Sequence, residues 1–324
     1  MIAALRTPDE RFENLPDFDY TPRYTTLAHA PSLRLHYVDE GPRDGATFLC
    51  LHGEPSWSFL YRKMIPPFVE AGARVVAPDF FGFGRSDKPT DESIYTWGFH
   101  RQTLVDFIET LELSRITLVC QDWGGLLGLT LPMDMPERFE RMLVMNTALG
   151  TGLVPPTEGF LAWRDYVASR PDFDVGALLK RSAPELSDDE LAAYNAPFPD
   201  AQYKVGVRRF PQLVPITPEM EGAQVSRRAA LWLNTTWSGP TFMAVGARDP
   251  VLGVPVMRLL QQLIRGCPEP LILENAGHFV QEHGDVIAAA ALEAWAQSSS
   301  SSSSSSGSSS SSSSGSTSSS SKGS

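Results

Sequence analysis

Short apolar runs alternate with longer amphipathic stretches along most of this chain. Apolar runs of this length, bounded by Gly, Pro, Asp or Asn, predict buried strands. The predicted strands are Arg34–Val38, Thr47–Leu51, Arg74–Ala77, Ile116–Gln121, Met142–Asn146, Thr241–Val245 and Leu271–Glu274. Because alternating strands and helices are typical of a mostly parallel sheet joined by crossover helices, we predict an α/β fold.

Helical spacing of apolar residues marks the stretches Trp97–Leu111, Leu126–Met133 and Asp285–Ala296. The segment 149–224 breaks the alternation, since it is rich in Pro and aromatic residues and shows only short helical patterns such as Asp188–Tyr194. It falls between two strands of one sheet, so we predict a helical cap over the carboxyl ends of the strands, where such sheets bind ligands. The predicted core domain is then residues 1–148 and 225–296.

From Gln297 onward the chain is almost entirely Ser, with a few Gly. Such a segment has too little apolar surface to offset the entropy of ordering the chain. We therefore predict a disordered tail over residues 297–324.

The composition is ordinary for a globular enzyme, with 42% hydrophobic and 20% charged residues among 324. A net charge of -11 disfavours nucleic acid and anionic membranes as partners. Asp9 and Glu10 precede any apolar segment and no stretch is long enough to span a bilayer, so we expect a cytoplasmic protein. Cys50, Cys120 and Cys267 lack metal-site spacing and are expected to be reduced.

The strongest motif is the strand that ends at Gln121 and runs through Asp122, Trp123, Gly124 and Gly125 into a helical pattern. This is typical of a nucleophile elbow, in which small neighbours let strand and helix approach closely. The nucleophile position holds Asp, and a carboxylate with a reference pKa of about 3.9 is ionised without the help of a base. It suits attack on an sp³ carbon to form an ester. The alternative interpretation is a helix N-cap.

His278 follows the predicted strand Leu271–Glu274, at the sheet edge where we also expect Asp122. A neutral imidazole, with a reference pKa of about 6.5, can take a proton from water as that water attacks the ester. Asp249 follows the strand Thr241–Val245 and is expected to accept a hydrogen bond from His278, which fixes its tautomer. The alternatives are an ordinary histidine and an Asp-Pro turn.

Hydrogen-bond donors for anions form the remaining candidates. In an enzyme with a nucleophile elbow, the amide after the nucleophile and one from the loop after Thr47–Leu51 stabilise an anion, so we nominate the amides of Trp123 and Glu54. Indole N–H groups suit a departing halide, and the candidates are Trp123 and Trp163. Phe160 is a candidate apolar wall of the substrate pocket, with packing as the alternative.

The motifs HGEPSWS, PDFFGFGRSDKP, VCQDWGG, APFPD, GARDPVLG and AGHFVQE together resemble the haloalkane dehalogenases. The resemblance covers nearly all of residues 1–296 and is to the subfamily with the second halide-binding Trp early in the cap. It implies an α/β-hydrolase fold with an inserted helical cap, and the roles given above for Asp122, His278, Asp249, Trp123, Trp163 and Glu54. It also implies hydrolysis of short haloalkanes to alcohol, halide and proton, with water as co-substrate, no metal or organic cofactor, and a monomer.

Three alternatives stay open. An epoxide hydrolase would use the same Asp with acids for the opening oxygen, for which the cap offers Tyr166, Tyr194 and Tyr203. A haloacid dehalogenase would need cations for the substrate carboxylate, and the candidates are Arg164, Arg208 and Arg209. A non-catalytic binding protein of the same fold would not need the full set of nucleophile, base and acid.

Overall fold

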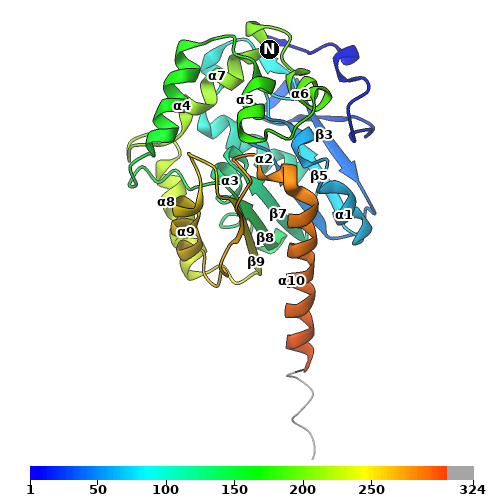
Figure 1. Cartoon of the computed structure of the whole chain (residues 1–324), viewed down its shortest axis with the longest axis vertical. Helices are drawn as coiled ribbons and strands as arrows, with labels where there is room; N and C mark the ends of the chain where they lie inside the picture. The colour runs from blue at the N-terminus through cyan, green and yellow to red at the C-terminus, as the bar shows by residue number, and fades with distance from the viewer. Residues whose placement is uncertain (305–324) are drawn as a thin grey trace, which may run out of the picture.

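The computed structural model describes residues 1–304 (Figure 1). They form one eight-stranded sheet, whose strand order is β10-β9-β8-β7-β4-β5-β3-β2, with helices around it. Its strands are β2 (Arg23–Leu27), β3 (Ala30–Glu40), β4 (Thr47–Leu51), β5 (Arg74–Pro78), β7 (Ile116–Gln121), β8 (Phe139–Met145), β9 (Thr241–Gly246) and β10 (Leu271–Leu273). Strands β4, β5 and β7 to β10 are parallel, whereas β3 runs antiparallel to β5 and β2. The predicted mostly parallel sheet is confirmed. Two short strands, β1 (Ala4–Leu5) and β6 (Lys88–Pro89), form a separate antiparallel pair.

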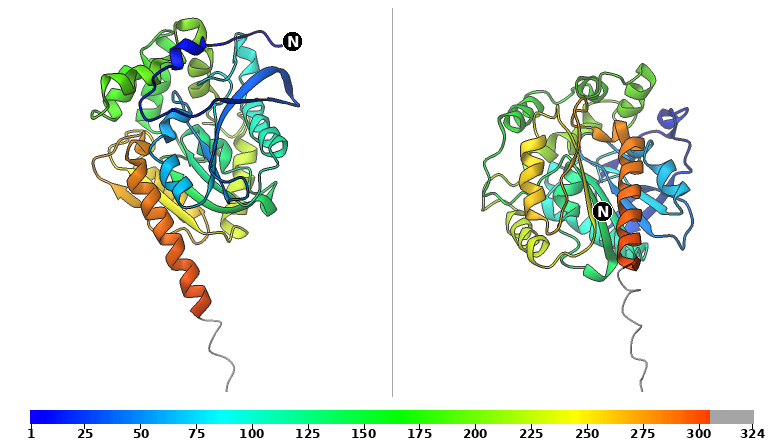
Figure 2. Two further views of the ribbon diagram at one scale, coloured as in Figure 1. Left: turned by 90° about the vertical axis from the view of Figure 1, so that its right-hand side faces the viewer. Right: turned by 60° about the horizontal axis from the view of Figure 1, so that its bottom comes forward.

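Helices cover both faces of the sheet (Figure 2). Helices α1 (Ile65–Glu70) and α10 (Gly284–Ser304) lie on one face, and α2 (Trp97–Thr110), α3 (Trp123–Gly128), α8 (Ala223–Thr235) and α9 (Val254–Leu263) lie on the other. The helix predicted at Leu126–Met133 is instead Trp123–Gly128. It begins directly after the strand, and it ends early because the Pro132 ring would clash with the carbonyl of Gly128 if the helix continued.

The last helix is longer than the sequence predicted. Helix α10 runs to Ser304, so residues 297–304 of the predicted disordered tail are helical. Extending an existing helix by one residue costs far less than nucleating one, which favours this continuation. The remainder of that prediction, residues 305–324, lies outside the described residues. Within residues 1–304, no helix is both long and apolar enough to cross a membrane.

The segment 149–224 contains the helices α4 (Glu158–Ser169), α5 (Val175–Ser182), α6 (Asp188–Asn195) and α7 (Val205–Leu213). Side chains of Thr157, Asp174 and Ser187 accept backbone N–H bonds at the starts of α4, α5 and α6, so local sequence determines where these helices begin. Figure 1 shows all four helices gathered at one end of the molecule.

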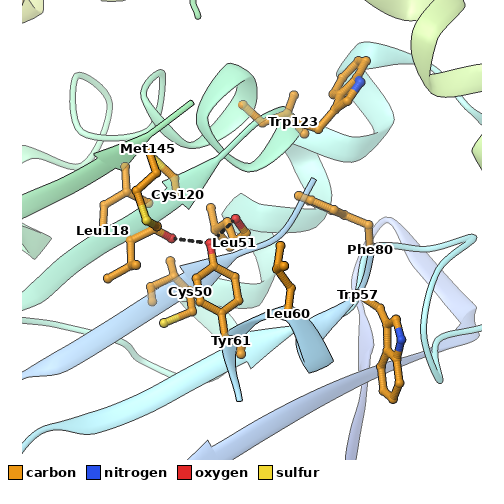
Figure 3. Packing of buried hydrophobic residues seen from close by; sticks show 14 of the residues in the cluster. Cys50, Leu51, Trp57, Leu60, Tyr61, Phe80, Leu118, Cys120, Trp123 and Met145 are labelled. Carbon is orange, nitrogen blue, oxygen red and sulfur yellow. Dashed lines mark hydrogen bonds between the residues drawn. The ribbon is translucent and has the colours of Figure 1, made fainter. Parts of the chain in front are cut away.

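The core beneath the functional end of the sheet is tightly packed around Tyr61 (Figure 3). The Tyr61 hydroxyl donates to the carbonyl of Leu51, the last residue of β4, over 2.7 Å. Cys50 and Cys120 lie beside this ring, and together with Cys267 they are buried and free. Burial raises the pKa of the Cys50 and Cys120 thiols, which therefore stay protonated core groups.

A buried ionic cluster joins the inserted segment to the core. Arg62 is 1% exposed and donates to both carboxylate oxygens of Glu282, over 2.9 and 2.7 Å. It also donates to Glu190 of α6 over 2.6 Å. The hydroxyl of Tyr194, on the same helix, donates to Glu282. Because Glu282 follows His278 by four residues, this cluster anchors α6 beside the loop that carries the candidate base.

Replacing Arg62 by Met should lower the free energy of unfolding by about 3 to 5 kcal/mol, because it leaves the buried carboxylate of Glu282 with only the partly exposed ammonium of Lys63 as a cation. Urea denaturation near neutral pH measures this loss. Lys63→Met is the matched control, since Lys63 reaches the same carboxylate over 3.0 Å but is 30% exposed. We expect the control to lose about 1 kcal/mol or less. Equal losses in the two variants would contradict the role given to the buried cation.

Candidate active site

Asp122 lies at the turn between β7 and α3 with a φ of 50°, in the left-handed region. Its N–H donates to the carbonyl of Asn146 over 2.9 Å, and its own carbonyl accepts from the Thr147 hydroxyl over 2.7 Å. A Cβ at Gly124 would lie 2.0 Å from the carbonyl oxygen of Leu51, so only glycine lets α3 begin this close to β4. The backbone thus forms the strained strand-to-helix turn expected from the sequence.

The two carboxylate oxygens of Asp122 face different partners. Oδ1 accepts the N–H of Glu54 over 2.8 Å. A Cβ at Gly53 would lie 2.4 Å from Oδ1, so this approach requires glycine at position 53. Oδ2 lies 3.5 Å from Nε2 of His278. One oxygen is therefore held by a backbone amide while the other faces the imidazole.

Asp249 is buried and holds the other side of the imidazole, with 2.7 Å between its Oδ2 and Nδ1 of His278. Its carboxylate also accepts from Nδ2 of Asn146 over 2.9 Å and from the N–H of Val251 over 2.8 Å. Burial alone would raise the pKa of Asp249, but His278 and these donors lower it below the ordinary value. Asp249 therefore stays charged and keeps Nδ1 as the donor.

Both carboxylates act on the protonation of His278. Burial disfavours the imidazolium, but the carboxylates of Asp249 and Asp122 outweigh it and raise the pKa of His278 to about 10. The Nε2 group of Gln121 lies 3.0 Å from Nε2 of His278, and it donates to the His278 carbonyl over 3.2 Å. The N–H of His278 donates to the hydroxyl of Ser182 over 2.8 Å. The base is thus held by the last residue of β7 and the last residue of α5.

The side chain of Glu54 is a third carboxyl group at the site, and it was nominated from the sequence only for its backbone amide. Burial raises the pKa of Glu54 well above its ordinary value, and the charge on Asp122 raises it further. The indole of Trp163 acts in the opposite direction as a hydrogen-bond donor. Within the described chain, Oε1 of Glu54 has no hydrogen-bond partner. These surroundings favour the neutral carboxylic acid.

A cavity of about 760 Å³ connects Asp122, His278, Asp249 and Glu54. The seven residues that the sequence analysis assigned to a dehalogenase-like site all line it: Asp122, His278, Asp249, Trp123, Trp163, Glu54 and Phe160. Its other walls are mainly apolar, with Leu126, Leu149, Leu178 and Val214 among them, and the exposed Arg181, Arg248 and Asn275 line its outer end. No group of three or more His, Cys, Asp or Glu side chains in residues 1–304 could hold a metal ion.

The side chains required by two of the alternative activities lie elsewhere. Among the described residues that line the cavity there is no tyrosine, since Tyr194 bonds Glu282 and Tyr166 and Tyr203 lie outside it. The arginines considered for a haloacid, Arg164, Arg208 and Arg209, do not line it either. Arg164 donates to Gln212 over 2.8 Å, for example. The residues considered from the sequence for these two activities therefore do not line the cavity that contains Asp122.

Three residues at the site were missed by the sequence analysis: Asn146, Gln121 and Ser182. Gln121 is fully buried in an apolar strand directly before the nucleophile, and a polar side chain in that position was a usable signal. Asn146 follows β8 at the same edge of the sheet and could have been found by the same reasoning. Ser182 lies in the inserted segment, and nothing local in the sequence connects it with His278.

Comparison with known proteins gives consistent results. The family model for the alpha/beta hydrolase fold matches residues 46–285. The haloalkane dehalogenase of Psychrobacter cryohalolentis is 45% identical over 293 residues, 89% of this chain and 96% of that protein. That of Mycolicibacterium paratuberculosis is 41% identical over 298 residues, 91% and 99% of the two chains. The tetrameric haloalkane dehalogenase DpaA from Paraglaciecola agarilytica NO2 has a TM-score of 0.88 and 50% identity, covering 90% of this chain and 98% of its own.

Infrared spectroscopy can test the protonation of Glu54. At neutral pH, the difference spectrum between the wild type and Glu54→Gln should contain the carbonyl stretch of a protonated carboxylic acid, because burial raises this pKa. An acid is protonated below its pKa, so the band should persist at neutral pH and disappear as the pH rises through the raised value. Asp249→Asn is the matched control and should remove only carboxylate bands. A carboxylate band for Glu54 at neutral pH would refute the assignment.

Proposed function

The chain belongs to the α/β-hydrolase family and, within it, to the haloalkane dehalogenases, hydrolases that act on carbon–halogen bonds; from this premise we propose that it hydrolyses small haloalkanes through an ester on Asp122. The observation that carries the proposal is the convergence of a carboxylate, an imidazole held by a second carboxylate, and two indoles on one apolar cavity. The substrates are short chloro- or bromoalkanes, and the products are an alcohol, a halide ion and a proton.

The first step is displacement of the halide. Oδ2 of Asp122 attacks the carbon that bears the halogen, so that a C–O bond forms as the carbon–halogen bond breaks and the halide departs with the electron pair. The amide of Glu54 keeps Oδ1 out of the reaction. The indole N–H groups of Trp123 and Trp163, which both line the cavity, donate to the departing anion. Hydrogen bonds to a charged group contribute about 1.5 to 3 kcal/mol each.

Ester formation changes the electrostatics of the base. Asp122 loses its charge, so only Asp249 still favours the imidazolium, and His278 becomes neutral more readily than in the free enzyme. Nε2 then accepts a proton from water while the water oxygen attacks the ester carbonyl, and Asp249 stabilises the resulting imidazolium. The amides of Glu54 and Trp123 stabilise the negative charge that develops on Oδ1. Collapse of this intermediate breaks the bond between Cγ and Oδ2, and the leaving oxygen takes the proton from His278 to depart as the alcohol. The carboxylic acid formed on Asp122 then releases a proton, which restores the carboxylate.

All groups in this mechanism come from one chain. We assign residues 1–148 and 225–296 to the core that carries the nucleophile, base and acid, and residues 149–224 to a cap that supplies Trp163 and Phe160. The steps use water and no metal or organic cofactor. The relative from Paraglaciecola agarilytica is tetrameric, but a complete site within each chain makes the proposed chemistry possible in a monomer.

The variant His278→Ala should release about one equivalent of bromide from 1,2-dibromoethane or 1-bromobutane and then stop, because ester formation does not need the base but ester hydrolysis does. Intact-protein mass spectrometry should show an alkyl adduct on Asp122. The controls are Asp122→Ala, which should form no adduct, and His283→Ala, a partly exposed histidine of the same loop that should turn over normally. Turnover of styrene oxide without halide release from any bromoalkane would overturn the proposal.

Trp163→Phe should slow the halide-releasing step by about 10- to 100-fold, the effect of losing one charged hydrogen bond. Trp163 stacks on Tyr166 with 5.8 Å between ring centroids, and a phenylalanine ring keeps most of this contact, so packing should change little. Rapid-quench measurement of the first turnover isolates this step. Trp232→Phe is the matched control, because Trp232 packs against Trp237 away from the cavity. Equal halide-release rates for Trp163→Phe and the wild type would rule out this role for Trp163.

A further inference from the structure

Gln121 is fully buried at the end of β7, directly before the nucleophile. Its amide nitrogen lies 3.0 Å from Nε2 and 3.2 Å from the carbonyl oxygen of His278. Its Oε1 has no hydrogen-bond partner in the described part of the chain. Both polar contacts of this buried amide are therefore made with one residue, the candidate base.

The backbone of His278 fixes the orientation of the Gln121 amide. A carbonyl oxygen only accepts hydrogen bonds, so the atom that faces it at 3.2 Å must be the NH₂ group. Exchanging the nitrogen and oxygen of the amide would bring two oxygens together at this distance. The same NH₂ group then meets Nε2, and an N–H donor can bond a ring nitrogen only when that nitrogen carries no proton.

We propose that Gln121 is a positioning residue that favours the neutral form of His278 once Asp122 is esterified, with the proton on Nδ1 and the amide bonded to Nε2 until the attacking water takes its place. The inference rests on the role of base proposed above for His278. Gln121 is not among the described residues that line the cavity, so it acts through His278 and not on the substrate.

The groups that face the imidazole act in opposite directions. The carboxylates of Asp249 and Asp122 favour the imidazolium, and so would Glu54 if it were ionised. Burial and the amide of Gln121 favour the neutral ring. In the ester intermediate Asp122 carries no charge. Only Asp249 then favours the imidazolium, whereas burial and the amide of Gln121 favour the neutral ring. Fewer charges therefore oppose Gln121 in the state in which a neutral base is required.

The variant Asp122→Asn reproduces this uncharged state without any turnover. NMR titration of His278 in Asp122→Asn should give a lower pKa than in the double variant Gln121→Met/Asp122→Asn, by about one unit or more, which is a tenfold change in the protonation equilibrium. Gln281→Met/Asp122→Asn is the matched control, because Gln281 is equally buried on the loop that follows His278 but makes no hydrogen bond to it among the described residues. An unchanged or lower pKa in the Gln121 double variant would overturn the proposal.

A measurement on Asp122→Asn alone covers the case in which the Gln121 variant fails to fold. Nitrogen-15 spectra should show Nδ1 of His278 protonated, Nε2 unprotonated, and a scalar coupling across the hydrogen bond from Gln121 to Nε2. The opposite tautomer would refute the inference directly.

Kinetics of Gln121→Met in the otherwise wild-type enzyme provide the functional readout. The first release of bromide should keep its rate within about twofold, whereas the acid limb of the pH profile for ester hydrolysis should move up by about one unit. A merely structural role would slow both steps and leave this limb in place. If the wild type released no halide, the proposed function would fail, while the NMR titration would still decide the inference about Gln121.

Discussion

The left-handed turn at Asp122 is the constraint on which the rest of the site depends. A φ of 50° turns the chain sharply from β7 into α3 and exposes the carboxylate at the end of the sheet. Such backbone is strained for a residue with a side chain, so it persists only where the surroundings stabilise it. The Asn146 carbonyl accepts a hydrogen bond from the N–H of Asp122, and the Thr147 hydroxyl donates one to its carbonyl. These bonds, and the absence of a side chain at Gly124, stabilise the turn.

Three carboxyl groups around one imidazole would be unfavourable if all were charged. The structure gives each a different environment. The carboxylate of Asp122 accepts a hydrogen bond from the N–H of Glu54, and that of Asp249 accepts hydrogen bonds from His278, Asn146 and Val251. These bonds stabilise both carboxylates as anions. Glu54 is buried beside Asp122 with one oxygen unpartnered, which favours its neutral form. Identical chemical groups thus take different charge states because of burial and hydrogen bonding.

The inserted segment does more than close the cavity. Ser182, at the end of α5, accepts the backbone N–H of His278, and Glu190 on α6 pairs with the buried Arg62. Arg62 in turn holds Glu282, on the turn that follows His278. The position of the base therefore depends on contacts from both the core and the inserted segment. A change in how the segment packs would therefore shift the position of His278 without any change at Asp122.

The sequence by itself located seven of the eight strands of the main sheet, all but β2, and predicted the turn at Asp122 and candidate roles for His278, Asp249, Trp123 and Trp163. These follow from local patterns: alternating apolar runs, small residues beside a nucleophile and polar residues directly after strands. Only the tertiary structure decided that Tyr194 bonds Glu282 and so lies away from the cavity, that the Glu54 carboxyl is buried, and that Gln121 and Ser182 hold His278. Such contacts join residues far apart in the chain, and their energies depend on distance and burial, which no local pattern encodes.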